Sequence, residues 1–149
     1  MKGEKALPPK YLMISVVVMV ALHFLFPGPR LIPTPWNLAG LIPLALGTVL
    51  NIIADGDLRK VATTVKPFEE SAALVSTGAY RISRHPMYLG FVLILIGLAV
   101  LLGTPTPWVV IPVFIVLMER VFIVVEERML DDRFAQVWLD YRNRVRRWI

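Results

Sequence analysis

Four apolar runs, each close in length to a membrane-spanning helix, constrain this chain more than any other feature of its sequence. A helix needs about 20 apolar residues to cross the hydrocarbon core of a bilayer. The composition agrees, with 56% hydrophobic residues, 18% charged residues and a mean hydropathy of +0.65. We therefore predict an all-α integral membrane protein with four transmembrane helices, at residues 11–26, 36–54, 88–103 and 107–125.

The first run also has features of a signal peptide, because a basic start precedes a short apolar stretch. The run ends in Pro27, Gly28, Pro29 and Arg30, and no small-residue cleavage pattern accompanies it. We expect a retained membrane anchor.

Lysine and arginine are distributed unevenly over the segments that connect these runs. They gather before the first run, between the second and third, and after the fourth (Lys2, Lys5, Lys10, Arg59, Lys60, Lys66, Arg81, Arg84, Arg128, Arg133, Arg142, Arg144, Arg146, Arg147). The other side has Arg30 and an uncharged turn at residues 103–107. Because cytoplasmic loops carry the excess of positive charge, we expect both termini in the cytoplasm. The net charge of +5 then reflects topology and contact with anionic lipids, which argues against nucleic-acid binding.

The chain has no cysteine, which excludes disulfides and thiolate metal sites. Its two histidines, His23 and His85, lack the spacing of metal ligands, so we predict no structural metal. His23 and Asn51 are isolated polar residues in the first two runs, and we expect them to form hydrogen bonds within the bundle.

Residues 78–90, with the sequence GAYRISRHPMYLG, bring Arg81, Arg84 and His85 to the start of an apolar helix. Ionisable groups at a membrane boundary are costly to desolvate, which makes them a candidate functional site. The alternative is an anchor of the positive-inside type. Pro86 suits the first turn of a helix, so His85 should lie near its N-cap, where the helix dipole favours an anion.

The third and fourth runs are connected by GTPTP, a short turn that predicts antiparallel neighbours. The start of the third helix should then lie beside the charged end of the fourth, at Glu119, Arg120, Glu126 and Glu127. The simpler alternative is that Glu126 and Glu127 only mark the water boundary. Glu119 and Arg120 lie deeper in apolar sequence, where we expect a paired or functional role.

The tail at residues 126–149 has the periodicity of an amphipathic helix, with apolar positions at Met129, Leu130, Phe134, Val137, Trp138, Tyr141 and Val145. We expect a cytoplasmic helix that lies on the membrane surface, covers the pocket between the last two helices, or does both.

The stretch ATTVKPFEESAALVSTGAYRISRHPMYLG, followed by EERMLDDRFAQVWLDYRNRV, resembles the isoprenylcysteine carboxyl methyltransferase family. That family lies within a wider group of membrane methyltransferases that includes phospholipid N-methyltransferases. The resemblance covers residues 62–145 and implies one membrane-embedded methyltransferase domain at residues 1–149. It also implies that S-adenosylmethionine is enclosed between the last two helices by two cytoplasmic segments, residues 55–87 and 126–149.

Five positions depart from the family pattern: Ala62, Ala79, Ala135, Trp138 and Arg146 stand where the family commonly has glycine, proline, glycine, tyrosine and proline. None of these changes removes an ionisable group from the central motif. Ala135 and Trp138 could reshape the pocket, so they bear on substrate identity more than on cofactor use.

Methyl transfer from a sulfonium needs a positioned acceptor, a bound cofactor and the exclusion of water. There is no G-x-G-x-x-G motif, so a Rossmann cofactor site is absent. The cofactor must then be held by carboxylates at its amino group or ribose hydroxyls, by cationic groups at its carboxylate, and by aromatic rings. The candidates are Tyr80, Arg84, His85, Pro86, Tyr88, Leu89, Glu127 and Tyr141. For catalysis, Arg120 is the candidate for orienting a substrate carboxylate, and Glu126 for a base or positioning group.

Each assignment has a structural alternative. His85 could cap its helix, the tyrosines could be interfacial aromatics, and Arg120 could pair with Glu119 of a neighbouring helix or protomer. Two other functions stay open: an NADPH-dependent membrane reductase of the sterol-reductase type, and a non-catalytic membrane scaffold or small transporter. The acceptor can be a carboxylate, a thiol or an amine, on a lipophilic or a small molecule.

Overall fold

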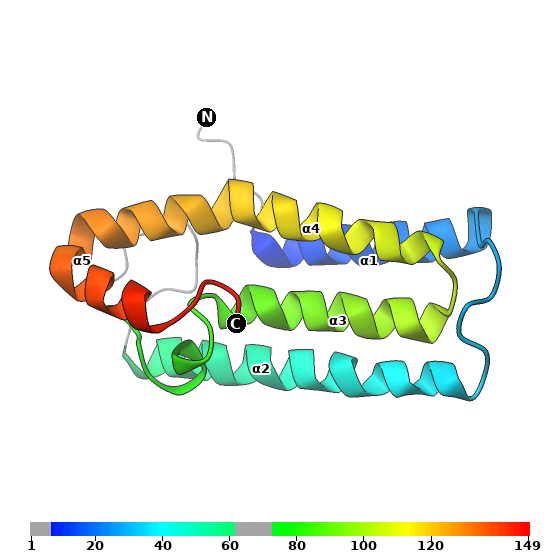
Figure 1. The fold of residues 1–149 in the computed structure, drawn as a ribbon, viewed down its shortest axis with the longest axis horizontal. Helices are drawn as coiled ribbons and strands as arrows, with labels where there is room; N and C mark the ends of the chain where they lie inside the picture. The colour runs from blue at the N-terminus through cyan, green and yellow to red at the C-terminus, as the bar shows by residue number, and fades with distance from the viewer. Residues whose placement is uncertain (1–6, 62–72) are drawn as a thin grey trace.

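Helices make up most of the described backbone, and the longer ones run side by side along one axis (Figure 1). The structure is a computed structural model that describes residues 7–61 and 73–149, and no strand occurs in these two ranges. The longer helices are α1 (Pro8–Leu25), α2 (Leu41–Lys60), α3 (Pro86–Leu102), α4 (Val110–Met118) and α5 (Val124–Arg144). Short elements are the 3-10 helices η1 (Trp36–Gly40), η2 (Gly78–Arg81) and η3 (Thr106–Val109), and the π-helix η4 (Glu119–Ile123). The predicted all-α fold is confirmed.

Three of the described helices are long and apolar enough to cross a membrane, at Pro8–Leu25, Trp36–Lys60 and Thr106–Arg144. The fourth apolar helix, α3, has 17 residues and is shorter. These helices contain or overlap the four predicted spans, and they are consistent with an integral membrane protein. The orientation of the termini stays a prediction. Residues 62–72, which include Ala62 and the first part of the stretch that resembles the methyltransferase family, lie outside the described residues.

Helices α2 and α3 pack closely because glycines face each other across their contact. A Cβ atom built on Gly47 would lie 2.4 Å from the carbonyl oxygen of Gly90, and one on Gly40, at the end of η1, would lie 2.4 Å from that of Gly97. Small residues at such positions let two helix backbones approach in a membrane, where no hydrophobic driving force joins the helices. This contact places the start of α3 beside the middle of α2, where Gly90 lies next to Gly47 and Asn51.

The apolar core lies where α1, α3 and the α4–η4 helix meet. Met19, Leu95, Met118 and Phe122 are fully buried there. Tyr11 and Phe122 meet edge to face with ring centroids 5.3 Å apart. The connection Gly103–Thr106 makes α3 and α4 antiparallel neighbours, as the GTPTP turn predicted.

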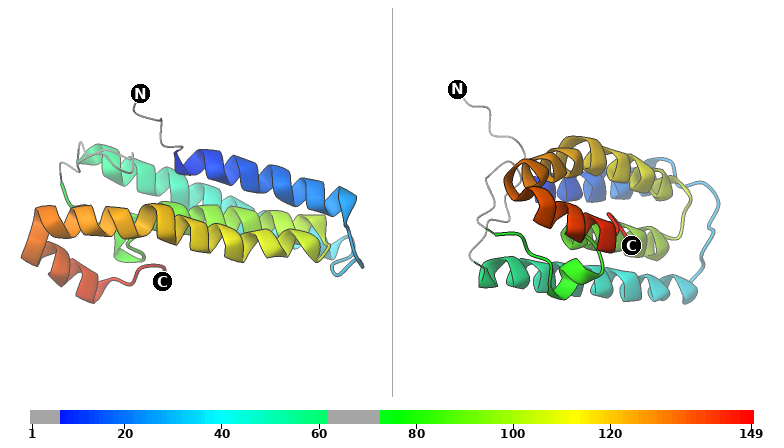
Figure 2. Two further views of the ribbon diagram at one scale, coloured as in Figure 1. Left: turned by 90° about the horizontal axis from the view of Figure 1, so that it is seen from above. Right: turned by 60° about the vertical axis from the view of Figure 1, so that its left-hand side comes forward.

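The helix of the fourth predicted span continues without a break beyond residue 125, into the predicted amphipathic helix. It continues from α4 through η4 into α5, and it reverses direction at Ala135, which has φ 42° and ψ −114°. The remainder of the chain then folds back over the start of α3 (Figures 1 and 2). Trp138 and Tyr141 of the predicted apolar face are buried, whereas Val137 is 62% exposed.

Candidate functional site

The segment that precedes α3 is held against the end of α2 by a buried carboxylate. Asp57 accepts a hydrogen bond from the backbone N–H of Ala79 at 3.0 Å and pairs with Lys60. Gly78 has φ +61°, and a Cβ atom there would lie 2.0 Å from Oδ2 of Asp57, so only glycine fits beside the carboxylate. This attachment sets the position of η2 and of the residues that follow it.

A tight turn then places His85 at the N-terminal end of α3. The hydroxyl of Ser83 accepts a hydrogen bond from the backbone N–H of His85 at 3.1 Å. His85 is the N-cap residue of α3 and Pro86 follows as its first residue, as predicted. The imidazole makes no capping hydrogen bond, so helix capping does not account for this side chain.

His85 instead lies between two glutamates of α5. Its Nδ1 is 3.3 Å from Oε2 of Glu126, and its Nε2 is 3.3 Å from Oε1 of Glu127. The hydroxyl of Tyr88, one turn further along α3, donates a hydrogen bond to Oε1 of Glu126 at 2.8 Å. Burial opposes the charged form of His85, but the hydrogen bonds to both glutamates outweigh it and raise the pKa of His85 above its ordinary value.

Arg84 lies on the other side of Glu127. Its Nη1 is 3.3 Å from Oε1 of Glu127, and its guanidinium carbon lies 5.6 Å from the ring centre of Trp138. Burial lowers the pKa of Arg84, partly offset by Glu127. The Nε and Nη1 atoms of Arg84 are buried and make no hydrogen bond with any described residue. Nε is therefore available to an acceptor group at this point, whereas Nη1 faces Glu127.

The remaining predicted cofactor residues surround this cluster. The hydroxyl of Tyr141 donates a hydrogen bond to the backbone oxygen of Tyr80 at 2.7 Å, which ties the folded-back part of α5 to η2. Pro86 is buried, and the backbone N–H of Leu89 donates to the oxygen of His85 at 3.1 Å. Two segments far apart in sequence thus meet, as the antiparallel arrangement of α3 and α4 predicted. Among the described residues, no group of three or more His, Cys, Asp or Glu could hold a metal ion.

Arg147, which the sequence analysis did not single out, completes the cluster. Its Nη2 donates to Oε2 of Glu127 at 2.6 Å and its Nε donates to Oε1 at 3.1 Å, while its Nη1 pairs with Glu119. No sequence pattern separates Arg147 from Arg144 or Arg146, because the reversal at Ala135 decides which arginine reaches the glutamates.

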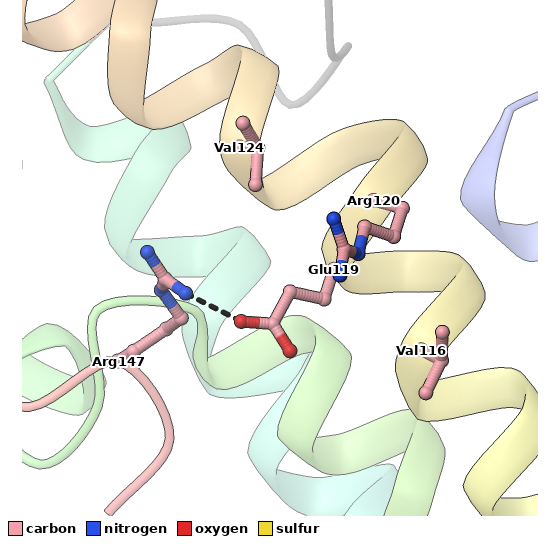
Figure 3. A pocket seen from close by; sticks show the side chains of 5 residues that line it. All are labelled: Val116, Glu119, Arg120, Val124 and Arg147. Atoms are coloured by element: carbon pink, nitrogen blue, oxygen red, sulfur yellow. Dashed lines mark hydrogen bonds and ion pairs between the residues drawn. The ribbon is translucent and has the colours of Figure 1, made fainter.

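An open pocket of about 340 Å³ adjoins the cluster and is lined by Val116, Glu119, Arg120, Val124 and Arg147. Figure 3 shows Arg147 reaching Glu119 from the C-terminal segment, while Arg120 comes from the same helix as Glu119. Arg120 is exposed and forms no ion pair or hydrogen bond with a described residue. Glu119 is therefore paired with the C-terminal segment and not with Arg120.

Two comparisons with known proteins agree on one family. The family described as "Phospholipid methyltransferase" matches residues 36–137 of the chain. The chain is 33% identical to "Protein-S-isoprenylcysteine O-methyltransferase" of Saccharomyces cerevisiae over 136 residues, which cover 82% of this chain and 54% of that protein. It is also 33% identical to "Protein-S-isoprenylcysteine O-methyltransferase B" of Arabidopsis thaliana, over 90% of this chain and 68% of that protein. The chain thus spans about half the length of the yeast relative.

Proposed function

The chain belongs to the phospholipid methyltransferase family, and from this premise we propose that it is an S-adenosylmethionine-dependent methyltransferase of the membrane. Its acceptor is a lipophilic or small, membrane-accessible molecule that carries a carboxylate, a thiol or an amine. The yeast and Arabidopsis relatives are named as O-methyltransferases that act on isoprenylcysteine, which favours a carboxylate among these three groups.

One observation carries the proposal: His85 contacts both Glu126 and Glu127, at 3.3 Å each, although it lies far from them in the sequence. Buried charges cost free energy even when they are paired, and ionisable groups with shifted pKa values often gather at functional sites. Tyr88, Arg84 and Tyr141 surround the same point.

The residues of this cluster suit the polar groups of S-adenosylmethionine. The Nε donor of Arg84, which makes no hydrogen bond with a described residue, fits the cofactor's carboxylate, with which a guanidinium forms strong charge-assisted hydrogen bonds. Glu127 fits its amino group or ribose hydroxyls, and the rings of Tyr80 and Tyr88 are available for stacking or hydrogen bonding. When bound, S-adenosylmethionine supplies a methyl group on a sulfonium, which leaves as a neutral thioether.

The pocket at Glu119 and Arg120 suits the acceptor. Val116 and Val124 give it apolar walls, and Arg120 offers a positive charge that no described residue neutralises. Arg120 would orient an acceptor carboxylate. Such a carboxylate becomes an ester without losing a proton, whereas a thiol or an amine must release one. Glu126, which contacts His85, would accept that proton.

We further propose that the site faces the cytoplasm and that both termini lie there. The arginines and lysines on this side of the bundle support the orientation. A water-soluble cofactor would then enter from the cytoplasm and a lipophilic acceptor from the membrane.

The test is calorimetric binding of S-adenosylmethionine and S-adenosylhomocysteine to the detergent-purified protein. His85→Ala and Glu127→Ala should each abolish saturable binding. His23→Ala is the matched control, because His23 bonds to Thr104 at the opposite end of α3, at 2.8 Å. Absence of binding to the folded parent protein would contradict the proposed function, and binding of NADPH in its place would favour a reductase.

A further inference from the structure

Arg147 uses its whole guanidinium to join two carboxylates of one helix. Nε and Nη2 form a two-point contact with Glu127 at 3.1 Å and 2.6 Å, and Nη1 pairs with Glu119. Glu119 lines the open pocket, whereas Glu127 belongs to the cluster around His85. One side chain therefore touches both parts of the candidate site.

The backbone at Arg147 is fixed against the segment that precedes α3. The hydroxyl of Ser83 donates to the carbonyl oxygen of Arg147 at 3.0 Å, and the N–H of Arg84 donates to that of Arg146 at 3.0 Å. Trp148 packs against the hydrophobic core. The guanidinium thus extends from a backbone that is anchored beside Arg84 and His85.

The contacts on Glu127 are divided between its two oxygens. Arg84 and His85 approach Oε1 at 3.3 Å each, and Nε of Arg147 donates to the same oxygen at 3.1 Å. Oε2 is contacted by Arg147, at 2.6 Å. Without Arg147, no described residue would hold Oε2 of Glu127 in place. Glu119 would also lose its partner in the pocket.

We propose that Arg147 is a positioning residue, which orients Glu127 toward the cofactor and holds Glu119 at the wall of the acceptor pocket. The inference rests on the function proposed above. Arginine suits this role because its planar fork meets a carboxylate at two points and still has a third nitrogen to offer, whereas lysine acts as a point charge.

The experiment measures the affinity of S-adenosylhomocysteine by calorimetry, together with thermal unfolding, for four variants of the full chain. Arg147→Ala should weaken binding about 10-fold or more, because a charge-assisted contact is lost. Arg147→Lys should recover part of that loss. Glu119→Gln should stay within about twofold of the parent, because Glu119 faces the pocket and not the cofactor.

Arg128→Ala is the matched control, since Arg128 is an exposed arginine of α5 whose removal changes the net charge equally. The inference is overturned if Arg147→Ala binds within about twofold of the parent or loses no more affinity than Arg128→Ala. It is also overturned if lost binding parallels lost folding and Arg147→Lys restores neither, because Arg147 would then have a structural role alone. If the parent itself does not bind, the proposed function fails, and the role of Arg147 fails with it.

Discussion

The imidazole Nε2 of His85 lies 3.3 Å from Oε1 of Glu127, although 42 residues separate the two in the chain. His85 is the N-cap residue of α3, and Glu127 lies in the first turn of α5, shortly after the π-helix η4. A π-helical turn is rare and often occurs at functional sites. Here it ends at Ile123, within one turn of the two glutamates, so its geometry bears on where Glu126 and Glu127 point.

The protein should lose stability as the pH rises above the ordinary pKa of histidine, 6.5. The two glutamates raise the pKa of His85, so the folded state binds its proton more tightly than the unfolded state does. Its contribution is complete below pH 6.5 and disappears as the pH passes through the raised, folded-state pKa. Thermal unfolding in detergent between about pH 5 and pH 9 measures this effect.

His85→Gln keeps a polar side chain but cannot take up a proton, so its stability should vary less with pH over the same range. A parent whose unfolding temperature does not change with pH, or a variant with an unchanged slope, would contradict the assignment.

Ala135→Gly should stabilise the protein by about 1 kcal/mol. Ala135 has φ 42° and ψ −114°, a conformation that costs a residue with a Cβ about 1–3 kcal/mol and glycine little. The greater freedom of glycine in the unfolded chain offsets about 0.4–1 kcal/mol of that gain. Denaturation in a mild detergent compares the variant with the parent.

Ala45→Gly is the control, because Ala45 is exposed within α2, where glycine should cost about 0.5–1 kcal/mol. Equal destabilisation by both substitutions would show that Ala135 is not strained.

Gly47→Ala should destabilise the contact between α2 and α3 by about 1–3 kcal/mol. The added Cβ would lie 2.4 Å from the carbonyl oxygen of Gly90, and the backbones must separate to admit it. Gly56→Ala tests the reverse case in the same helix, because nothing lies within 4 Å of a Cβ atom there. That variant should gain about 0.5–1 kcal/mol from helix propensity. Similar unfolding temperatures for the two variants would rule out close packing at Gly47.

Arg120→Ala should leave folding and cofactor affinity unchanged but impair the use of an anionic acceptor. Arg120 is exposed and has no ion pair with a described residue, so its loss should change the free energy of unfolding by less than about 0.5 kcal/mol. Methyl transfer to an S-isoprenylcysteine analogue should fall about 10-fold or more if Arg120 meets its carboxylate. Radiolabel transfer from S-adenosylmethionine measures this loss. A variant that fails to assemble would instead assign Arg120 a structural role between helices.

The predictions from sequence succeed where a property depends on a local pattern or on a short connection between two helices. The apolar runs, the GTPTP turn, the N-cap position of His85 and the meeting of the RHP segment with Glu126 and Glu127 all agree with the structure. His23 also forms a hydrogen bond within the bundle, to Thr104. The apolar runs follow from the preference of apolar side chains for hydrocarbon. The other features follow from the restricted backbone of proline and from the need of short connections to join neighbouring helices.

Other relationships depend on where distant segments meet. The depth of Glu119 and Arg120 in apolar sequence suggested a paired or functional role for both, but it did not identify Arg147 as the partner of Glu119. The close approach of Gly47 to Gly90 was also not predicted. A helical repeat specifies which residues share a face, but it does not specify which face of another helix they meet.

The sequence by itself thus determined the apolar helices, the family and most of the residues that form the cluster. Only the tertiary structure decided that Arg147, among several tail arginines, reaches Glu119 and Glu127. The physical reason is the backbone of Ala135: its positive φ turns the end of α5 back over α3, and a small change in one such dihedral moves every residue beyond it.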